Sequence, residues 1–176
     1  MRRPSWDEYF MILAKMAASR STCLSRPTGA VIVKDKQIVA TGYNGSLPGQ
    51  PHCSDEGRCF RRSVGTDEAV KYDVCRSAHA EANAIVLAAK KGLCVEGGTI
   101  YCTLEPCFTC AKMIVMAGIQ RVVYEFAYES PLPERDLFWK DILEKAGARV
   151  EQLRLTDDDI VYADEFLKPD TSKRRI

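Results

Sequence analysis

Histidine is scarce in this sequence, with only two copies among 176 residues, at positions 52 and 79. Long apolar runs are absent as well, and no stretch is long enough to span a bilayer. The residues after Met1-Arg2-Arg3-Pro4 mix polar and apolar side chains and lack the apolar core of a signal peptide. The lack of a membrane-spanning run and of a signal-peptide core favours a cytoplasmic protein over a secreted or membrane-spanning one.

No charge of one sign predominates, since 25 Lys and Arg residues are balanced by 24 Asp and Glu residues. Proteins that bind nucleic acid usually present a strongly basic face, so we expect neither a nucleic acid nor a membrane as a partner. Lys173-Arg174-Arg175 is a small basic run, which we interpret as part of a flexible basic tail over 169–176. Residues 1–168 are expected to form a single domain, because this length supports one adequate core.

Cysteine, in contrast, is plentiful. Eight cysteines lie at positions 23, 53, 59, 75, 94, 102, 107 and 110. Reducing compartments rarely preserve structural disulfides, so clustered cysteines there more often bind metal or take part in chemistry. The positions of these cysteines therefore need a chemical explanation.

The pattern of apolar residues predicts alternating helices and strands. The expected helices cover 6–17, 79–91, 107–117 and 136–146, and a last one, capped by Thr156 with Asp159, reaches Leu167. The expected strands cover 29–33, 38–43, 99–104, 121–126 and 149–155, the first two joined as a hairpin. Strands that alternate with helices favour an α/β layer sandwich with parallel strands in its second half.

A long segment over 45–77 differs from the rest in being rich in Gly, Pro, Ser and charged residues. It contains Cys53, Cys59 and Cys75. A loop of this length inside a compact domain is uncommon and is usually functional or tied down. Such a segment cannot fix itself by burial of apolar side chains, whereas a bound metal can fix it.

Two short motifs place metal-binding side chains at the start of two expected helices: His79-Ala80-Glu81 and Pro106-Cys107-Phe108-Thr109-Cys110. Cysteines at i and i+3 share one helix face, so both sulfurs can reach one ion, and the positive helix end favours the metal-binding thiolate. Three ligands, His79, Cys107 and Cys110, leave the fourth position of a tetrahedral zinc open, as in catalytic sites. A purely structural zinc would need a fourth protein ligand.

Glu81 lies two residues beyond the histidine and is not needed as a ligand. A carboxylate there can take a proton from a metal-activated water and deliver it to a ring nitrogen and a departing amine. H-x-E combined with P-C-x-x-C is typical of zinc nucleobase deaminases. A competing hypothesis, from a different class, is a CxxC thiol redox protein that uses Cys107 and Cys110, because C-x-x-C at a helix start is also thioredoxin-like.

From about Thr22 to Tyr128 the sequence resembles the deoxycytidylate (dCMP) deaminases of the cytidine deaminase superfamily. The resemblance rests on the two metal motifs, on the long segment 45–77, and on Gly29-Ala30-Val31-Ile32-Val33, Gly42-Tyr43-Asn44-Gly45 and Pro51-His52-Cys53. It implies a three-layer α/β/α fold with a mixed central sheet of about five strands, the hairpin first and then parallel strands. It also implies zinc-dependent hydrolysis of dCMP to dUMP and ammonia, which supplies dUMP for thymidylate synthesis.

The resemblance also implies contacts with substrate and effectors. Asn44 is expected to contact the nucleotide sugar, Ala80 to offer its backbone N–H to the pyrimidine, and Tyr128 to lie beside the sugar-phosphate. Asn44 is alternatively only a turn residue, because Tyr-Asn-Gly is good turn chemistry. Arg26, Lys112 and backbone N–H groups all remain open as ligands of the 5′-phosphate. Members of the family are often homo-oligomers regulated by dCTP and dTTP, with Mg²⁺ as a companion of the nucleotide effector.

Some dCMP deaminases carry a second, structural zinc, and Cys23 and Cys53 lie where two of its ligands are expected. Cys59, Cys75 and His52 are candidates for the other ligands. The alternative is that these cysteines are small buried apolar residues, as free cysteines usually are.

Other deaminases of the superfamily compete with this interpretation. Thr103-Leu104-Glu105-Pro106-Cys107 also resembles tRNA adenosine deaminases and the pyrimidine deaminases of riboflavin synthesis. The balanced charge and the segment 45–77 argue against a tRNA substrate. The same segment, together with Gly42-Tyr43-Asn44-Gly45, argues against free cytidine. We therefore favour dCMP as the substrate.

Overall fold

In the computed structural model, which describes residues 3–65, 74–128 and 133–167, the central sheet begins with a tight hairpin. Its strands β1 (Gly29–Lys34) and β2 (Gln37–Tyr43) are antiparallel. Asp35 and Lys36 between them take the positive φ angles, 52° and 60°, that a two-residue hairpin turn requires. Each strand is one residue longer at this turn than the sequence pattern predicts.

Three parallel strands complete the sheet. They are β5 (Thr99–Leu104), β6 (Arg121–Phe126) and β7 (Arg149–Gln152). Because β5 lies antiparallel to β1, the sheet is mixed, with the strand order β2-β1-β5-β6-β7. The expected sheet of about five strands, a hairpin followed by parallel strands, is confirmed.

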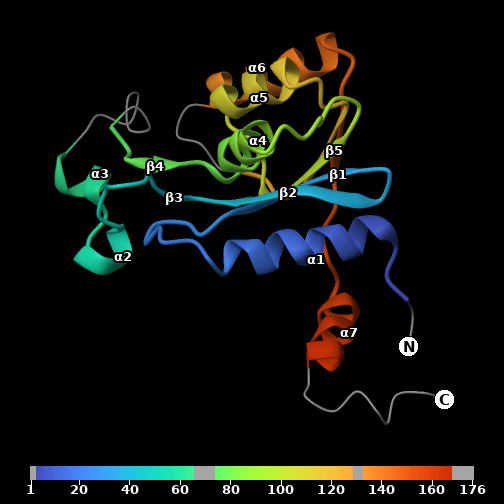
Figure 1. The fold of residues 1–176 in the computed structure, drawn as a ribbon, viewed down its shortest axis with the longest axis horizontal. Helices are drawn as coiled ribbons and strands as arrows, with labels where there is room; N and C mark the ends of the chain where they lie inside the picture. The colour runs from blue at the N-terminus through green and yellow to red at the C-terminus, as the bar shows by residue number, and fades with distance from the viewer. Residues whose placement is uncertain (1–2, 66–73, 129–132, 168–176) are drawn as a thin grey trace.

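Helices cover both faces of this sheet (Figure 1). One face carries α4 (Ala80–Lys90), α5 (Phe108–Met116) and α6 (Pro133–Lys145), and the other carries α1 (Trp6–Ala18), with α7 (Asp157–Leu167) beyond it. The expected three-layer α/β/α fold is therefore confirmed as well.

Alternating side chains on the strands build a separate core on each face. In β1, Ala30 and Ile32 pack into the core beneath α4, α5 and α6, whereas Val31 and Val33 pack against α1. The first core also buries Trp139 of α6. Because the central strands β1, β5 and β6 are buried on both faces, their sequences are nearly continuous apolar runs, whereas the outer strands β2 and β7 are partly exposed and mix polar residues.

Two glycines let helices lie directly on the hairpin. A Cβ on Gly42 would lie 2.1 Å from the carbonyl oxygen of Ala80, and a Cβ on Gly29 would lie 2.1 Å from that of Ala14. No side chain fits at either position unless a helix moves. Gly42 therefore sets how closely the beginning of α4 approaches β2.

Polar contacts fix the beginning of α1 to the sheet. Ser5 and Glu8 form a reciprocal capping box at its first turn. Asp7 accepts hydrogen bonds from both terminal nitrogens of Arg121 at 2.8 Å and from the Tyr101 hydroxyl at 2.6 Å. The pairing with Arg121 lowers the pKa of the Asp7 carboxyl.

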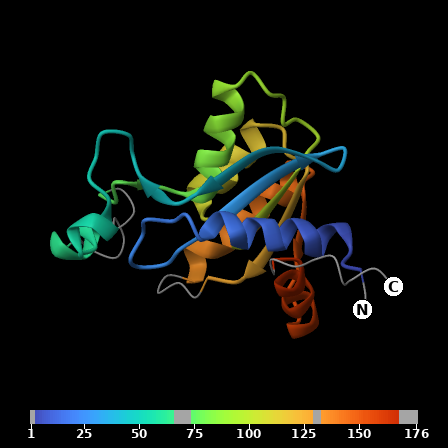
Figure 2. The same ribbon diagram turned by 60° about the horizontal axis from the view of Figure 1, so that its bottom comes forward.

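The described parts of the cysteine-bearing segment 45–77, residues 45–65 and 74–77, project from one end of the sheet (Figures 1 and 2). The two-residue strands β3 (Gly45–Ser46) and β4 (Ser77–Ala78) pair antiparallel at its base. Between them lie two single-turn helices, α2 (Cys53–Glu56) and α3 (Phe60–Ser63). The composition predicts the segment but none of these short elements.

Elsewhere the expected boundaries differ from the observed ones by a few residues. β7 ends at Gln152 and not at 155, although the Leu153 N–H still donates to the Tyr124 carbonyl of β6 at 2.9 Å and Leu153 and Leu155 pack against the core on the α1 side. The helix expected over 136–146 begins earlier, at Pro133, a residue well suited to a first turn. Thr156 and Asp159 bond reciprocally at the start of α7, which confirms that cap.

The sequence also predicts a flexible basic tail and no segment that spans a membrane. The basic tail 169–176 lies outside the described residues, so it stays a prediction. Among the helices of the described ranges, none combines the length and the apolar character needed to cross a membrane.

Candidate metal centre

One edge of the sheet gathers the segments that the sequence predicts to be functional. The carboxyl ends of β5 and β6 lie at this edge, and because β1 runs antiparallel to β5, its first residues lie there too. Gly29 pairs with Tyr43, which brings the end of β2 to the same place. Ligand sites in α/β sheets usually form at the carboxyl ends of the strands.

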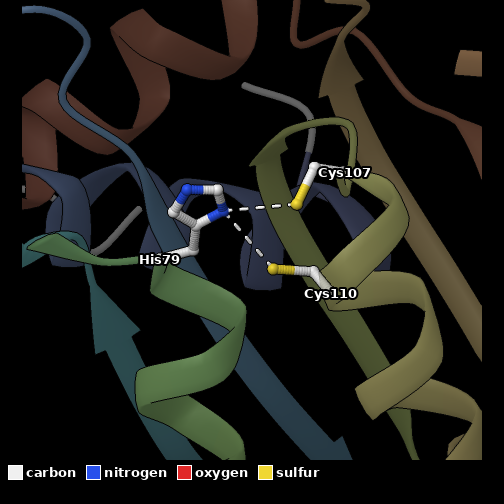
Figure 3. Close-up of side chains that lie close together, drawn as sticks. All are labelled: His79, Cys107 and Cys110. Atoms are coloured by element: carbon white, nitrogen blue, oxygen red, sulfur yellow. Dashed lines mark hydrogen bonds between the residues drawn. The ribbon is translucent and has the colours of Figure 1, made fainter. Parts of the chain in front are cut away.

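The three predicted zinc ligands meet between the beginnings of α4 and α5 (Figure 3). His79 is the N-cap residue of α4, Cys107 is the N-cap residue of α5, and Cys110 lies in the first turn of α5. His79 Nδ1 lies 3.4 Å from Cys107 Sγ and 3.5 Å from Cys110 Sγ. The ligand atoms of all three lie within 4.8 Å of one another. The fold thus brings His79 to cysteines 28 and 31 residues away in the sequence.

These separations fit a zinc ion. Zinc binds imidazole nitrogen at about 2.0–2.1 Å and thiolate sulfur at about 2.3 Å, so two such ligands at a tetrahedral angle lie about 3.5 Å apart. The observed distances of 3.4 and 3.5 Å agree with this value. One nitrogen and two sulfurs also make a donor set that zinc prefers, and they leave one tetrahedral position for water or substrate.

The surroundings of the centre favour an ionised cysteine. The hydrogen bond from Cys110, aided by His79, lowers the pKa of Cys107 to about 4 even though burial opposes the change. The contact with Cys107 raises the pKa of His79 to about 9. The N-terminal ends of α4 and α5 add positive potential at the same point. Cys107 is therefore poised as a thiolate beside a protonated His79, and the contact with Cys107 raises the pKa of the Cys110 thiol. Zinc binding would release the protons of His79 and Cys110, because the metal takes neutral imidazole and thiolate as ligands.

Glu81 is buried beside the three ligands, with 7% of its surface exposed. Burial raises the pKa of its carboxyl to about 7, against the opposing influence of His79. A carboxyl that titrates near neutrality can both accept and release a proton at physiological pH. Cys102 lies buried in β5, and burial together with the charge of Glu81 raises the pKa of its thiol. Cys102 therefore stays a neutral thiol in the core.

Asn44 is buried and ties the segment before β1 to the end of β2. Its Oδ1 accepts hydrogen bonds from the Ser21 hydroxyl and, at 2.9 Å, from the Thr28 N–H. Its Nδ2 donates to the Arg26 carbonyl at 2.9 Å. Nδ2 carries a second hydrogen that these bonds do not use. The side chain thus has a positioning role and keeps a donor for the predicted contact with substrate.

The other two predicted substrate residues lie at the same edge. Ala80 is buried as the first residue of α4, where a backbone N–H has no acceptor within the helix. Tyr128 follows β6, and the Arg26 guanidinium lies over its ring at 5.0 Å from the centroid. Lys112 is exposed on α5 and lies over Phe108. Of the two cations left open for the phosphate, Arg26 therefore contacts a predicted substrate residue.

A cleft of about 570 Å³ lies at this edge, on the α1 side of the sheet. Its walls come from the end of α1, the segment 26–28, and the ends of β5 and β6. Inside it, Lys15 Nζ contacts both carboxylate oxygens of the buried Glu125 at 2.8 Å. Sequence reasoning missed this pair, because the two residues are 110 positions apart and no local pattern marks either of them.

The residues considered for a second zinc do not bring their ligand atoms together in the same way. In the described ranges, His79, Cys107 and Cys110 are the single group of three or more potential ligands whose ligand atoms lie close together. The four cysteines considered for a second zinc have free thiols: Cys23, Cys53, Cys59 and Cys75. His52, the fifth candidate, has Nδ1 3.2 Å from the Thr22 hydroxyl. The structure thus brings one predicted ligand set together and not the other.

Comparison with known proteins agrees with this geometry. Residues 4–126 match the family described as "Cytidine and deoxycytidylate deaminase zinc-binding region". ComE operon protein 2 of Bacillus subtilis (strain 168) is 41% identical over 157 residues, which cover 89% of this chain and 76% of that protein. A deoxycytidylate deaminase of Saccharomyces cerevisiae (strain ATCC 204508 / S288c) is 39% identical over 158 residues, which cover 90% of this chain. The chain spans 48% of the length of that yeast relative.

A solved structure shows the same fold. It is the crystal structure of a dCMP deaminase from the cyanophage S-TIM5 in complex with dCMP and dUMP. The two chains align with a TM-score of 0.68 at 30% sequence identity, covering 87% of this chain and 100% of the phage chain.

Proposed function

The chain belongs to the family that shares the cytidine and deoxycytidylate deaminase zinc-binding region, and we propose that it hydrolyses dCMP to dUMP and ammonia. The observation that carries this proposal is the meeting of one histidine, two cysteines and a buried glutamate at the carboxyl edge of the sheet. Relatives named deoxycytidylate deaminase support dCMP as the substrate. The product dUMP would then feed thymidylate synthesis.

His79, Cys107 and Cys110 are proposed to hold the zinc, since their donor types and separations fit it. Zinc bound by three protein ligands makes a water acidic enough to act as a nucleophile near neutral pH. All three ligands belong to the first turns or caps of two packed helices, so the backbone itself fixes their spacing.

Glu81 is proposed to move the protons. Its carboxylate would accept a proton from the attacking water and pass it to the pyrimidine N3. It would then take the second proton from the hydroxyl formed on C4 and deliver it to the amine, which leaves as ammonia while C4 becomes a carbonyl. The pKa of about 7 suits both directions of transfer. Because the side chain is buried, these transfers run between fixed partners and do not depend on bulk water.

Three residues are proposed to hold the nucleotide. The Ala80 N–H at the beginning of α4 donates to the pyrimidine, the unused Nδ2 hydrogen of Asn44 donates to the sugar, and Tyr128 lies beside the sugar-phosphate. The support is positional, because all three lie at the sheet edge that carries the metal centre.

A substrate panel tests the proposal. Ammonia release is measured with dCMP, deoxycytidine, CMP, cytidine and a tRNA anticodon stem. We expect the highest kcat/KM for dCMP, because a site that pairs a phosphate leaves its donors unpaired when the nucleoside binds. Equal kcat/KM for dCMP and deoxycytidine would indicate a nucleoside deaminase, and turnover of the tRNA stem alone would indicate a tRNA deaminase. A zinc-free protein that reduces disulfides would indicate the redox alternative.

Further proposals concern what surrounds the site. We propose a second, structural zinc with Cys23 and Cys53 among its ligands, and Cys59, Cys75 or His52 completing the set. The support is the number of cysteines in and near a segment with little apolar content. From the family we also propose a homo-oligomer, located in the cytoplasm and regulated by dCTP and dTTP with Mg²⁺. Residues 1–168 are proposed to act as one domain.

A further inference from the structure

Three neighbours hold the side chain of Asn44, and one of them is itself a side chain. The Thr28 N–H donates to Asn44 Oδ1 at 2.9 Å, and Asn44 Nδ2 donates to the Arg26 carbonyl at 2.9 Å. These two partners are backbone groups, which most substitutions leave in place. The third partner is the Ser21 hydroxyl, which donates to Oδ1. The orientation of the Asn44 amide therefore depends on the sequence through Ser21.

The Ser21 hydroxyl has a fixed direction. Its oxygen accepts a hydrogen bond from the Cys23 N–H at 3.1 Å. Its single hydrogen is left for Asn44, where the acceptors are Oδ1 and, at 3.0 Å, the backbone carbonyl oxygen. Hydrogen bonds that follow one another in this way polarise and strengthen each other. Ser21 is half-buried and Asn44 is buried, so little water competes for these groups.

The orientation of this amide matters because its two ends have opposite chemistry. With Oδ1 directed to its two donors, the NH₂ end keeps one hydrogen that none of these bonds uses. Asn44 also lies near the start of α4, because the carbonyl of the preceding residue, Tyr43, accepts a hydrogen bond from Asn83 Nδ2 at 2.7 Å. The amide therefore offers a donor, and not an acceptor, beside the helix that carries Glu81.

We propose that Ser21 is a positioning residue of the active site, which fixes the Asn44 amide so that its remaining N–H faces the sugar of the nucleotide. This assignment rests on the proposed contact between Asn44 and the sugar. Ser21 acts through Asn44 and not by touching the nucleotide. A donor that is held in place before binding loses less conformational freedom when the substrate arrives. Ser21 therefore strengthens binding of the nucleotide and leaves the chemistry at C4 to Glu81 and the metal centre.

The first test compares Ser21→Ala with Ser19→Ala in steady-state kinetics with dCMP. Ser19 is a matched control, because it lies two residues away and its hydroxyl donates to the Met16 carbonyl of α1 at 2.7 Å. We expect Ser21→Ala to raise KM by about 3- to 10-fold, the range for one lost neutral hydrogen bond, with kcat near the wild-type value. Ser21→Thr should recover most of this loss because it restores the hydroxyl, and Ser19→Ala should behave as wild type. Zinc content and melting temperature show whether each variant folds with its metal.

A double-mutant cycle separates positioning from a general loss of structure. If Ser21 acts through Asn44, Ser21→Ala should raise KM in the wild-type background and have little further effect in the Asn44→Ala background. Additive losses would overturn the assignment. An unchanged KM in Ser21→Ala, in a protein whose wild type deaminates dCMP, would overturn it as well and leave the proposed function intact.

Nuclear magnetic resonance of the substrate-free protein tests the position of the amide without turnover. The Asn44 NH₂ group gives a pair of signals in ¹⁵N-labelled protein. We expect a sharp pair in wild type and in Ser21→Thr, and a pair broadened by motion or exchanging faster with solvent in Ser21→Ala. An unchanged pair would show that Ser21 does not hold the amide. Because this measurement needs no substrate, it decides the role of Ser21 even if dCMP deamination itself fails.

Discussion

Two regions of this protein are rich in cysteine, and they are built in different ways. In the metal corner (His79, Glu81, Cys107 and Cys110), each side chain lies at or next to the start of a full helix that follows a strand. In the segment 45–77, Cys53 opens one single-turn helix, Cys59 is the N-cap residue of the other, and Cys75 lies just before the two-residue strand β4. Only the first region brings ligand atoms together among the described residues. Regular elements fix where thiols meet, whereas proximity in sequence alone does not.

The two regions also differ in what anchors them. The metal corner rests on backbone packing, because α4 lies directly on Gly42 and Asn83 Nδ2 donates to the Tyr43 carbonyl at 2.7 Å. The segment 45–77 touches the chain before β1 through hydrogen bonds from the Ser54 N–H to the Thr22 carbonyl at 3.2 Å and from Arg62 to the Ser25 hydroxyl at 3.1 Å. Within the segment, Arg76 pairs with Glu56 and lies over the Phe60 ring at 4.6 Å from its centroid. An anchor made of side chains near the surface contributes less than a packed helix. We therefore expect the segment to open locally before the sheet unfolds.

The largest effect should come from removing one zinc ligand of the metal corner, compared with removing one cysteine of the segment 45–77. Cys110→Ala should lose the bound zinc and bring turnover below detection, because two remaining ligands do not complete the site. Its matched control, Cys59→Ala, should keep both the catalytic zinc and turnover. Elemental analysis and ammonia release measure the two outcomes. An equal loss of activity in both variants would break the distinction between the regions.

Glu81→Gln should have the next largest effect. The amide fills the same space but cannot carry protons, so zinc should stay bound while kcat falls by about 10²–10⁴-fold. Glu56→Gln in the segment 45–77 is the matched control and should leave kcat near the wild-type value. Near-normal turnover of Glu81→Gln would falsify its role as the proton carrier.

The sequence predicts the metal corner well because its signals are local. Strands β5 and β6 are predicted with their observed bounds, and the two motifs open helices as expected. What the sequence does not predict depends on contacts between distant positions. Lys15 and Glu125 meet across 110 residues, and the role of Gly42 becomes visible only when α4 is placed on β2. Within the segment 45–77, single-turn helices leave no periodic pattern to recognise.

The number of zinc ions per chain shows whether cysteines outside the metal corner also bind metal. If the proposed second zinc exists, wild type should contain two ions per chain and Cys23→Ala should contain one, with turnover largely kept. Metal binding supplies folding energy when the site is absent from the unfolded chain, so the variant should also be cleaved faster within the segment 45–77. One zinc per chain in wild type would contradict the second site and indicate that Cys23 and the cysteines of the segment 45–77 only pack against their neighbours.

The smallest effects should come from breaking two ion pairs, Asp7–Arg121 on the sheet and Glu56–Arg76 in the segment 45–77. The arginine partner lowers the pKa of the acid in both pairs. A lowered folded-state pKa means that the pair stabilises the protein above the unfolded pKa, about 4, and that this contribution is lost as pH falls through the folded value. Asp7 is 35% exposed, so its contribution should be reduced by solvent to about 1 kcal/mol or less.

Asp7→Asn should therefore lower the melting temperature at pH 7 by about 2–4 °C at most. The difference from wild type should shrink as the pH falls below 4 and then through the lowered folded-state pKa of Asp7, because the wild-type carboxylate becomes protonated over that range. Glu56→Gln should leave the melting temperature unchanged and instead speed proteolysis within the segment 45–77, because its pair holds only that segment. If both variants lower the melting temperature equally, the segment unfolds together with the sheet. The two cysteine-rich regions would then share one cooperative structure despite their different construction.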